Sequence, residues 1–285
     1  MNSTVMKTGF KFALVSQLIG IASAIYSPSI PTAAERKPPP SQAVLNAIRD
    51  RGRLLAMMDR AAWVCTDRFR ERRKALSKER GAFIAYVDNG IYKVAFGVGS
   101  EDGKTFLTSF EGIFYQQTAR CDLDSFDPPR QDDGWLKEAY AAIQLARKAF
   151  KADPNVEAYN YAVVPESAEE VSVYFYPGTT GQVPVLGADA KISVRGEKTE
   201  VTRYHIALLK QVPPEKKGDE LVASMHTHLL DNLPNPLDVL YVMNRWIKAP
   251  EYILGEVWVF YINLNGEIEF AAYTDQVGKG GIKGK

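Results

Sequence analysis

This 285-residue sequence has no excess of charge of either sign, no long apolar run and no glycine-rich nucleotide-binding loop. The sequence has 35 Lys and Arg residues and 34 Asp and Glu residues, which give a net charge of +1. Nucleic-acid-binding proteins are typically much more basic, so this balance gives no indication of a nucleic-acid partner. The longest N-terminal apolar run, residues 12–21, is too short to span a bilayer comfortably. The sequence also lacks a P-loop, a G-x-G-x-x-G loop and a G-x-S-x-G elbow, which argues against nucleotide binding and serine-hydrolase chemistry.

The N-terminus has the pattern of an export signal. Lys7 and Lys11 precede or flank the start of the apolar run, and Ala22-Ser23-Ala24 supplies the small residues that signal peptidase recognises. We therefore predict cleavage after Ala24 and a periplasmic or secreted protein without a transmembrane segment once the signal is removed. An uncleaved anchor is the alternative interpretation.

Cysteine is limited to Cys65 and Cys121, so one disulfide is the only intramolecular pairing available. The oxidising compartment of an exported protein permits this bond, which would join the N-terminal helix to the strands that follow. The alternative is two buried free thiols. Neither cysteine lies beside a histidine in the sequence, which disfavours a cysteine nucleophile.

Composition and periodicity divide the chain into five predicted segments. Residues 1–24 form the signal peptide and 25–40 a proline-rich linker, followed by a helical segment over 41–80, an α+β domain over 81–274 and a flexible tail over 275–285. The predicted fold class is α+β, with a long N-terminal helix and then a mostly antiparallel sheet packed by one or two helices.

Two helices are predicted from apolar residues that recur at spacings of three and four. The first starts at Ser41, an N-cap residue type, and runs to Lys78, with Gly52 as a candidate interruption. Its basic end indicates either a solvated face or contact with an anionic surface, and the interleaved acidic residues favour the solvated face. The second helix covers residues 135–151, after an acidic, proline-containing loop over 122–133.

Strand patterns account for most of the remaining sequence. Asn89-Gly90 and Asn265-Gly266 each separate two apolar or alternating runs, a pattern that predicts a β-hairpin. Further strands are predicted over residues 105–110, 113–117, 159–164, 171–176, 191–194, 201–209 and 221–228. Several aromatic residues of these strands are expected mostly to build a core: Tyr159, Tyr161, Tyr174, Phe175 and Tyr176.

The candidate chemistry rests on three histidines in a short C-terminal window. Because residues two apart share one face of a strand, His226 and His228 place their imidazoles side by side, which supplies half of a zinc site. Asp231 and Asp238 are the candidate third ligands, the second of them near a predicted helix start. The alternation of its predicted strand places His205 on the surface. The alternative to a metal site is two polar histidines on a solvated or hydrogen-bonded face.

Residues 222–228, V-A-S-M-H-T-H, followed by Asp238 at a helix start, resemble the JAMM (MPN+) metalloprotease motif. In that family two histidines and a downstream aspartate hold zinc, while an upstream glutamate activates water. The resemblance implies His226, His228 and Asp238 as zinc ligands. Asp238 is one position closer to His228 than in the family pattern, and Asn235 or Pro236 stands where the family has serine.

The family's upstream glutamate has no counterpart at the usual modest distance from His226. Glu79, at the start of the first predicted hairpin, would occupy the topological place of that glutamate, and it is the candidate general base that the resemblance implies.

A longer resemblance leads to exported bacterial proteins of unassigned function, over residues 159–165, 173–177, 184–189 and 228–231. Two functions stay open at this point. The first is an exported, JAMM-like zinc hydrolase acting on peptide or isopeptide bonds, whose partner is a peptide or protein substrate. The second is a non-catalytic structural or interaction protein of the cell envelope, whose partner is another envelope component. Neither function involves nucleic acid.

Overall fold

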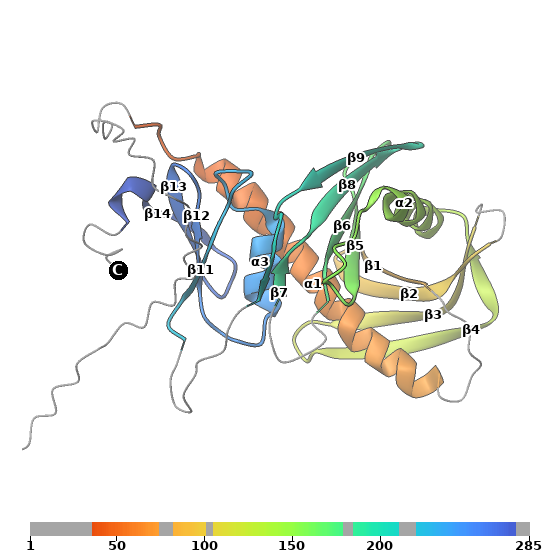
Figure 1. The fold of residues 1–285 in the computed structure, drawn as a ribbon. Coiled ribbons are helices and arrows are strands. Elements are labelled where there is room, and N and C mark those ends of the chain that lie inside the picture. The colour runs from red at the N-terminus through yellow and green to blue at the C-terminus, as the bar shows by residue number, and fades with distance from the viewer. Residues whose placement is uncertain (1–35, 74–81, 101–104, 179–184, 211–220, 278–285) are drawn as a thin grey trace, which may run out of the picture. The chain divides into compact units, whose positions relative to one another are not determined.

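The computed structural model describes residues 36–73, 82–100, 105–178, 185–210 and 221–277 (Figure 1). Helices and mainly antiparallel strands occupy separate stretches of the chain, which confirms the predicted α+β class. The predicted signal peptide and Glu79 lie outside the described residues. Within the described ranges, no helix combines the length and the apolar character needed to cross a membrane.

Helix α1 (Gln42–Arg73) is the long N-terminal helix that the sequence predicts. It begins after Ser41, whose carbonyl oxygen accepts hydrogen bonds from the backbone N–H groups of Val44 and Leu45. The predicted interruption at Gly52 is wrong, because the helix continues through it. A Cβ atom at Gly52 would lie 2.4 Å from the Cβ of Val239, so the glycine allows helix α3 (Pro236–Asn244) to approach closely.

The first sheet has the strand order β1–β2–β3–β4 with antiparallel pairing throughout. Asn89 and Gly90 both have positive φ, which confirms the first predicted hairpin. The prediction of an acidic loop over 122–133 is wrong for all but its last residue, because the chain there belongs to the last strand of the sheet. Its prolines are tolerated because this is an edge strand. The strands are β1 (Ala82–Asp88), β2 (Ile91–Gly99), β3 (Phe106–Tyr115) and β4 (Arg120–Asp132).

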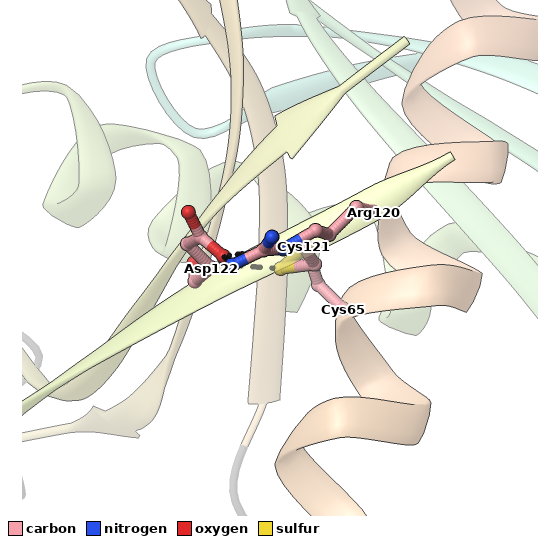
Figure 2. The surroundings of a disulfide bond; sticks show 4 residues. All are labelled: Cys65, Arg120, Cys121 and Asp122. Atoms are coloured by element: carbon pink, nitrogen blue, oxygen red, sulfur yellow. Dashed lines mark hydrogen bonds and ion pairs between the residues drawn. A yellow bond between two sulfur atoms is a disulfide. The ribbon is translucent and has the colours of Figure 1, made fainter. Parts of the chain in front are cut away.

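A disulfide fastens α1 to the first sheet (Figure 2). Cys65 on α1 and Cys121 on β4 have Cα atoms 5.3 Å apart and are fully buried. This bond confirms the predicted pairing and excludes the alternative of two free thiols. The long helix is therefore covalently attached to strand β4 of the first sheet.

The second sheet has the order β5–β6–β8–β9 and shares a core with helix α2 (Trp135–Ala149). Of the five aromatic residues expected in the core, all but Tyr159 are buried, and Tyr159 is partly buried. A short antiparallel pair, β7 and β10, accompanies this sheet. The strands are β5 (Tyr159–Pro165), β6 (Val171–Pro177), β7 (Val185–Gly187), β8 (Ala190–Arg195), β9 (Lys198–Arg203) and β10 (Leu208–Lys210).

The third sheet has the order β11–β12–β13–β14, and α3 packs on it. Strand β11 (Ser224–Thr227) pairs in parallel with β12 (Glu251–Leu254), and α3 lies in the crossover between them, as a parallel pair requires. Strands β13 (Trp258–Ile262) and β14 (Ile268–Tyr273) form the second predicted hairpin, and a short 3₁₀ helix, η2 (Thr274–Gln276), follows. The crossover brings the start of α3 close to the end of β11.

Candidate metal centre

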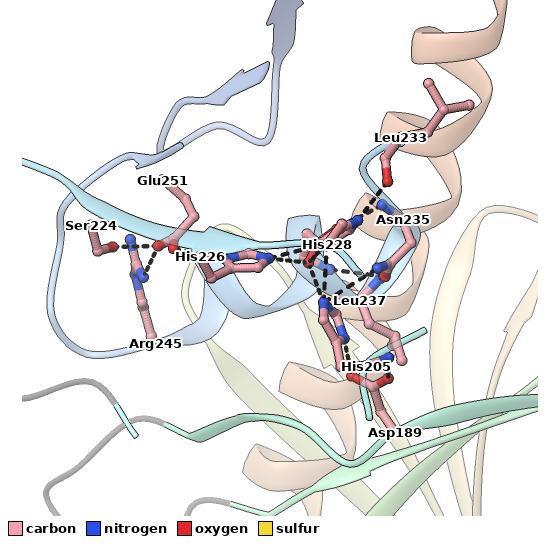
Figure 3. A network of polar contacts seen from close by, with 11 residues as sticks. Asp189, His205, Ser224, His226, His228, Leu233, Asn235, Leu237, Arg245 and Glu251 are labelled. Carbon is pink, nitrogen blue, oxygen red and sulfur yellow. Dashed lines mark hydrogen bonds and ion pairs between the residues drawn. The ribbon is translucent and has the colours of Figure 1, made fainter. Parts of the chain in front are cut away.

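Four side chains converge in the interior and form a candidate metal centre: His205, His226, His228 and Asp238. One nitrogen or oxygen atom from each lies within 4.8 Å of the others. Figure 3 shows the three histidines pointing toward one another. The exposed fraction is 8% for His226, 5% for His205 and His228, and 0% for Asp238. Burial excludes the solvated face of the alternative interpretation, and the structure shows a buried, hydrogen-bonded group that could hold a metal ion.

His226 and His228 lie side by side because of the strand geometry that the sequence predicts. His226 belongs to β11, and His228 follows its end, where its backbone N–H continues the parallel ladder by donating to the carbonyl oxygen of Leu254 at 2.8 Å. The two Nε2 atoms are 3.1 Å apart. Strand periodicity thus places both imidazoles at the same point.

Asp238 is aimed at the histidines by the cap of α3. Asn235 is the N-cap, and its side chain accepts hydrogen bonds from the backbone N–H groups of Leu237 and Asp238. Asp238 completes a capping box, because its Oδ2 accepts the backbone N–H of Asn235 at 2.7 Å. Its Oδ1 is left to face the Nε2 atoms of His205 and His226, at 3.0 and 3.1 Å. One carboxylate therefore both caps the helix and lines the site.

His205 is the fourth member of the cluster, and its predicted surface position is wrong. The predicted strand over 201–209 is interrupted: β9 ends at Arg203, and His205 lies in the irregular segment before β10. Asp189 holds it inward by accepting the backbone N–H of His205 at 3.1 Å and contacting its Nδ1 at 2.8 Å. Gly187 permits this packing, since a Cβ there would lie 2.0 Å from the carbonyl oxygen of Ala207.

Each histidine has an acceptor at Nδ1, which fixes its tautomer. The Nδ1 of His228 lies 2.7 Å from the carbonyl oxygen of Leu233, which can only accept a hydrogen bond. Nδ1 of His205 and of His226 contact the carboxylates of Asp189 and Glu251 at 2.8 and 2.9 Å. When the imidazoles are neutral, their lone pairs are therefore on Nε2 and point at the same centre, as in histidines that ligate metals.

The spacing of the ligand atoms matches a four-coordinate ion. Zinc bonds of about 2.0–2.1 Å in a tetrahedron place neighbouring ligand atoms about 3.3 Å apart. The Nε2 of His228 lies 3.2 Å from that of His205 and 3.1 Å from that of His226. The Oδ1 of Asp238 lies 3.0, 3.1 and 3.4 Å from the Nε2 atoms of the three histidines. Five of the six edges thus lie close to the tetrahedral length, and the sixth, between His205 and His226, is bounded only by the 4.8 Å spread of the group.

The pKa values show that the cluster attracts positive charge. Burial opposes the imidazolium form of His205, but the carboxylates of Asp238 and Asp189 outweigh it and raise the pKa of His205 to about 10. Burial likewise opposes the charged form of His226, and Asp238 and Glu251 raise its pKa to about 9. For Asp238, burial opposes ionisation, yet the imidazoles hold its pKa well below the usual range. The carboxylates therefore favour positive charge in the cluster, and a metal ion bound there would compete with protons for the imidazoles.

Two further candidate residues, Asp231 and Glu79, are not among the four described residues of the cluster. Asp231, the other candidate third ligand, is exposed and outside the cluster, and its Oδ1 accepts backbone N–H groups of its own loop. Glu79, outside the described residues, stays a prediction. Sequence reasoning missed Asp189, Glu251 and the inward position of His205; the one available signal for His205 was that the chain has only three histidines.

The comparisons with known proteins give no relatives: no family model, no curated protein and no solved structure matches this chain. The candidate centre therefore rests on its own geometry. That geometry includes all three residues of the HxH…D motif, together with His205.

Proposed function

We propose that this chain is an exported zinc-binding protein whose ion is held by His205, His226, His228 and Asp238. The observation that carries the proposal is the convergence of three Nε2 atoms and one carboxylate oxygen, five of whose six pairs lie 3.0–3.4 Å apart, with each Nδ1 already committed to an acceptor. Neutral imidazoles would aim three lone pairs at a buried carboxylate, so the cluster favours a positive charge, carried either by protons or by a metal ion.

The donor set favours zinc among the common ions. Calcium and magnesium prefer oxygen ligands and take six or more of them, whereas imidazole nitrogen with one carboxylate in a tetrahedron suits zinc. The ligands also come from separate parts of the fold: His205 follows a strand of the second sheet, and the other three belong to β11, its end and α3. An ion here would tie the second sheet to the third.

Export is supported by two features of different kinds. The first is the signal-like N-terminal sequence, and the second is the disulfide between Cys65 and Cys121, a bond typical of oxidising compartments. The proposal therefore places the protein in the periplasm or outside the cell, where a buried zinc ion and a disulfide would both stabilise it.

Hydrolysis of peptide or isopeptide bonds is a second candidate function, favoured by the absence of sulfur from the ligand set. Structural zinc sites are dominated by cysteine, and catalytic sites by histidine and carboxylate. The HxH strand followed by Asp238 in the first turn of α3 also agrees with the JAMM resemblance. Zinc supplies a Lewis acid and lowers the pKa of bound water. Here the reaction needs a coordination position beyond the four protein ligands, or exchange of His205 for water.

Metal analysis of the purified mature protein tests zinc binding. We expect about one zinc per chain in the wild type and in Asp231→Asn, the matched control for an acidic residue beside the site, because Asp231 is exposed and outside the cluster. His226→Ala and Asp238→Asn should lose the ion. A wild-type protein that stays free of zinc after incubation with it contradicts the proposal.

The same variants separate hydrolysis from a structural role. Zinc-loaded wild type and Asp231→Asn should cleave peptide or isopeptide-linked substrates, and His226→Ala should not. Full zinc occupancy without cleavage of any such substrate excludes the second candidate and leaves a zinc-stabilised structural or interaction protein of the cell envelope.

A further inference from the structure

The three histidines of the centre differ in the charge of the group behind each Nδ1. His228 faces a neutral carbonyl oxygen, whereas His205 and His226 face the buried carboxylates of Asp189 and Glu251. Such partners orient the ring and raise its basicity as a ligand. The two carboxylates are not equivalent, because their own surroundings differ in charge.

Glu251 is offset by a cation of its own. Its Oε2 accepts a hydrogen bond from Arg245 Nη1 at 2.6 Å and another from the hydroxyl of Ser224. Figure 3 shows the guanidinium of Arg245 beside the Glu251 carboxylate. Their side-chain exposures are 1% and 3%, so the pair is buried. The charge behind His226 is therefore balanced before any ion binds.

Asp189 has a different environment. Its exposed side-chain fraction is 1%, and its two oxygens take hydrogen bonds from the backbone N–H and the Nδ1 of the same residue, His205. Among the described residues, Asp189 forms its ion pair with that imidazole, which is neutral once its Nε2 binds a metal. A second positive charge is then needed close by, because a buried carboxylate without one is costly.

The formal charges at the centre leave a defined deficit. Within the described ranges, Asp238, Asp189 and Glu251 carry three negative charges at the centre and Arg245 carries one positive charge, which leaves two negative charges around neutral imidazoles. A divalent ion brings this sum to zero. Charge balance of this kind matters most in a buried site, where water does not screen it.

We propose that Asp189 is a positioning residue that makes His205 a metal ligand, and that Asp189 and Asp238 together match the centre to a divalent ion. This inference rests on the proposed zinc site. Asp189 acts through His205, because it aims the ring and supplies the second negative charge. Glu251 aims His226 in the same way without adding net charge, since Arg245 balances it.

The test compares Asp189→Asn with the wild type and with Asp231→Asn. A carboxamide keeps the shape and an acceptor oxygen but removes one negative charge, so zinc affinity measured by chelator competition should fall about 10- to 100-fold. X-ray absorption at the zinc edge should show fewer imidazole ligands in Asp189→Asn than the three of the wild type. Asp231→Asn should match the wild type in both measurements.

A double-mutant cycle shows whether Asp189 acts through His205. In the His205→Gln background, Asp189→Asn should cause much less further loss of zinc affinity than in the wild type, because the ring it positions is absent. Two independent, additive losses would overturn the positioning role. If Asp189→Asn does not fold, His205→Gln alone decides: zinc affinity equal to that of the wild type would overturn the proposal.

These outcomes separate the inference from the proposed function. Absence of zinc from the wild type removes both. Zinc in the wild type, with unchanged affinity and three imidazole ligands in Asp189→Asn, leaves the zinc site intact and removes the role of Asp189.

Discussion

Asp59 and Asp238 are both aspartates on helices, the first partly buried and the second fully buried, and their surroundings shift their pKa values in opposite directions. Asp59, on α1, accepts hydrogen bonds from the Tyr176 hydroxyl at 2.9 Å and from the Asn160 and Asn244 amides at 3.2 and 2.9 Å. Burial raises the pKa of Asp59, and these neutral donors offset only part of that effect. Asp238 faces three imidazoles, which hold its pKa low.

The difference shows that burial of a carboxylate does not by itself identify an ion site. Three neutral donors satisfy Asp59, and they join α1 to β5, β6 and the end of α3. Asp238 instead lies among groups that take up positive charge, either as protons or as a metal. A structural carboxylate and a candidate ligand therefore differ less in the number of their hydrogen bonds than in whether the neighbouring groups can carry a positive charge.

The largest expected effect is on zinc binding. Asp238→Asn should abolish zinc binding, whereas Asp59→Asn should keep about one zinc per chain, because only Asp238 offers an oxygen to the centre. Isothermal titration calorimetry at about pH 7.5 measures the zinc binding of both variants. Equal loss in the two variants would mean that the comparison reports general unfolding and not ligation.

The next effect concerns the disulfide that fixes α1, the helix of Asp59, to the first sheet. Replacing Cys65 and Cys121 by Ala should lower the free energy of unfolding by about 4 kcal/mol, since the bond closes a loop with a sequence separation of 56 residues. Urea denaturation measures the change. Zinc stoichiometry should be unaffected in the folded variant, and loss of zinc would show that the two regions are coupled.

A smaller effect is the pH dependence that Asp59 contributes. Because its pKa is raised in the folded protein, its contribution to stability is fully present below the unfolded value of about 3.9 and is lost as the pH rises through the folded value. The wild type should therefore lose stability relative to Asp59→Asn over this range, by about 1.4 kcal/mol for each unit of pKa difference. Denaturation of both proteins in the presence of a chelator, from about pH 4 to about pH 8, measures this difference in stability. A stability difference that does not change with pH would contradict the prediction.

The smallest effect is expected at the cap of α3. Asn235→Ser installs the residue type of the JAMM pattern and should change stability by less than about 0.5 kcal/mol, because Ser and Asn cap helices about equally well. Asn235→Ala should cost about 1 kcal/mol and weaken zinc binding, since the capping box that aims Asp238 is lost. Thermal unfolding with and without zinc measures both changes. Unchanged zinc affinity in Asn235→Ala would show that the cap does not orient the ligand.

Local patterns were sufficient for much of the fold. Asn89-Gly90 and Asn265-Gly266 specify their hairpins because the turn and its flanking strands are contiguous in the sequence. Cys65 and Cys121 have no other partner to choose. The pairing of His226 with His228 follows from the period of a strand, and the place of Asp238 follows from a helix start.

The rest of the site depends on contacts between distant segments. His205 turns inward because β9 ends at Arg203 and Asp189 holds the ring, and neither fact is visible in an apolar alternation. Glu251 reaches His226 through the parallel pairing of β11 with β12, which depends on the α3 crossover. Likewise, prolines in β4 indicate a loop until the strand is known to lie at a sheet edge.

The most direct test of the proposed zinc centre is anomalous diffraction at the zinc absorption edge from crystals of the protein. We predict one peak bonded to the Nε2 atoms of His205, His226 and His228 and to Asp238 Oδ1, at about 2.0–2.2 Å. Crystals grown with zinc that show no peak among these four residues would contradict the account.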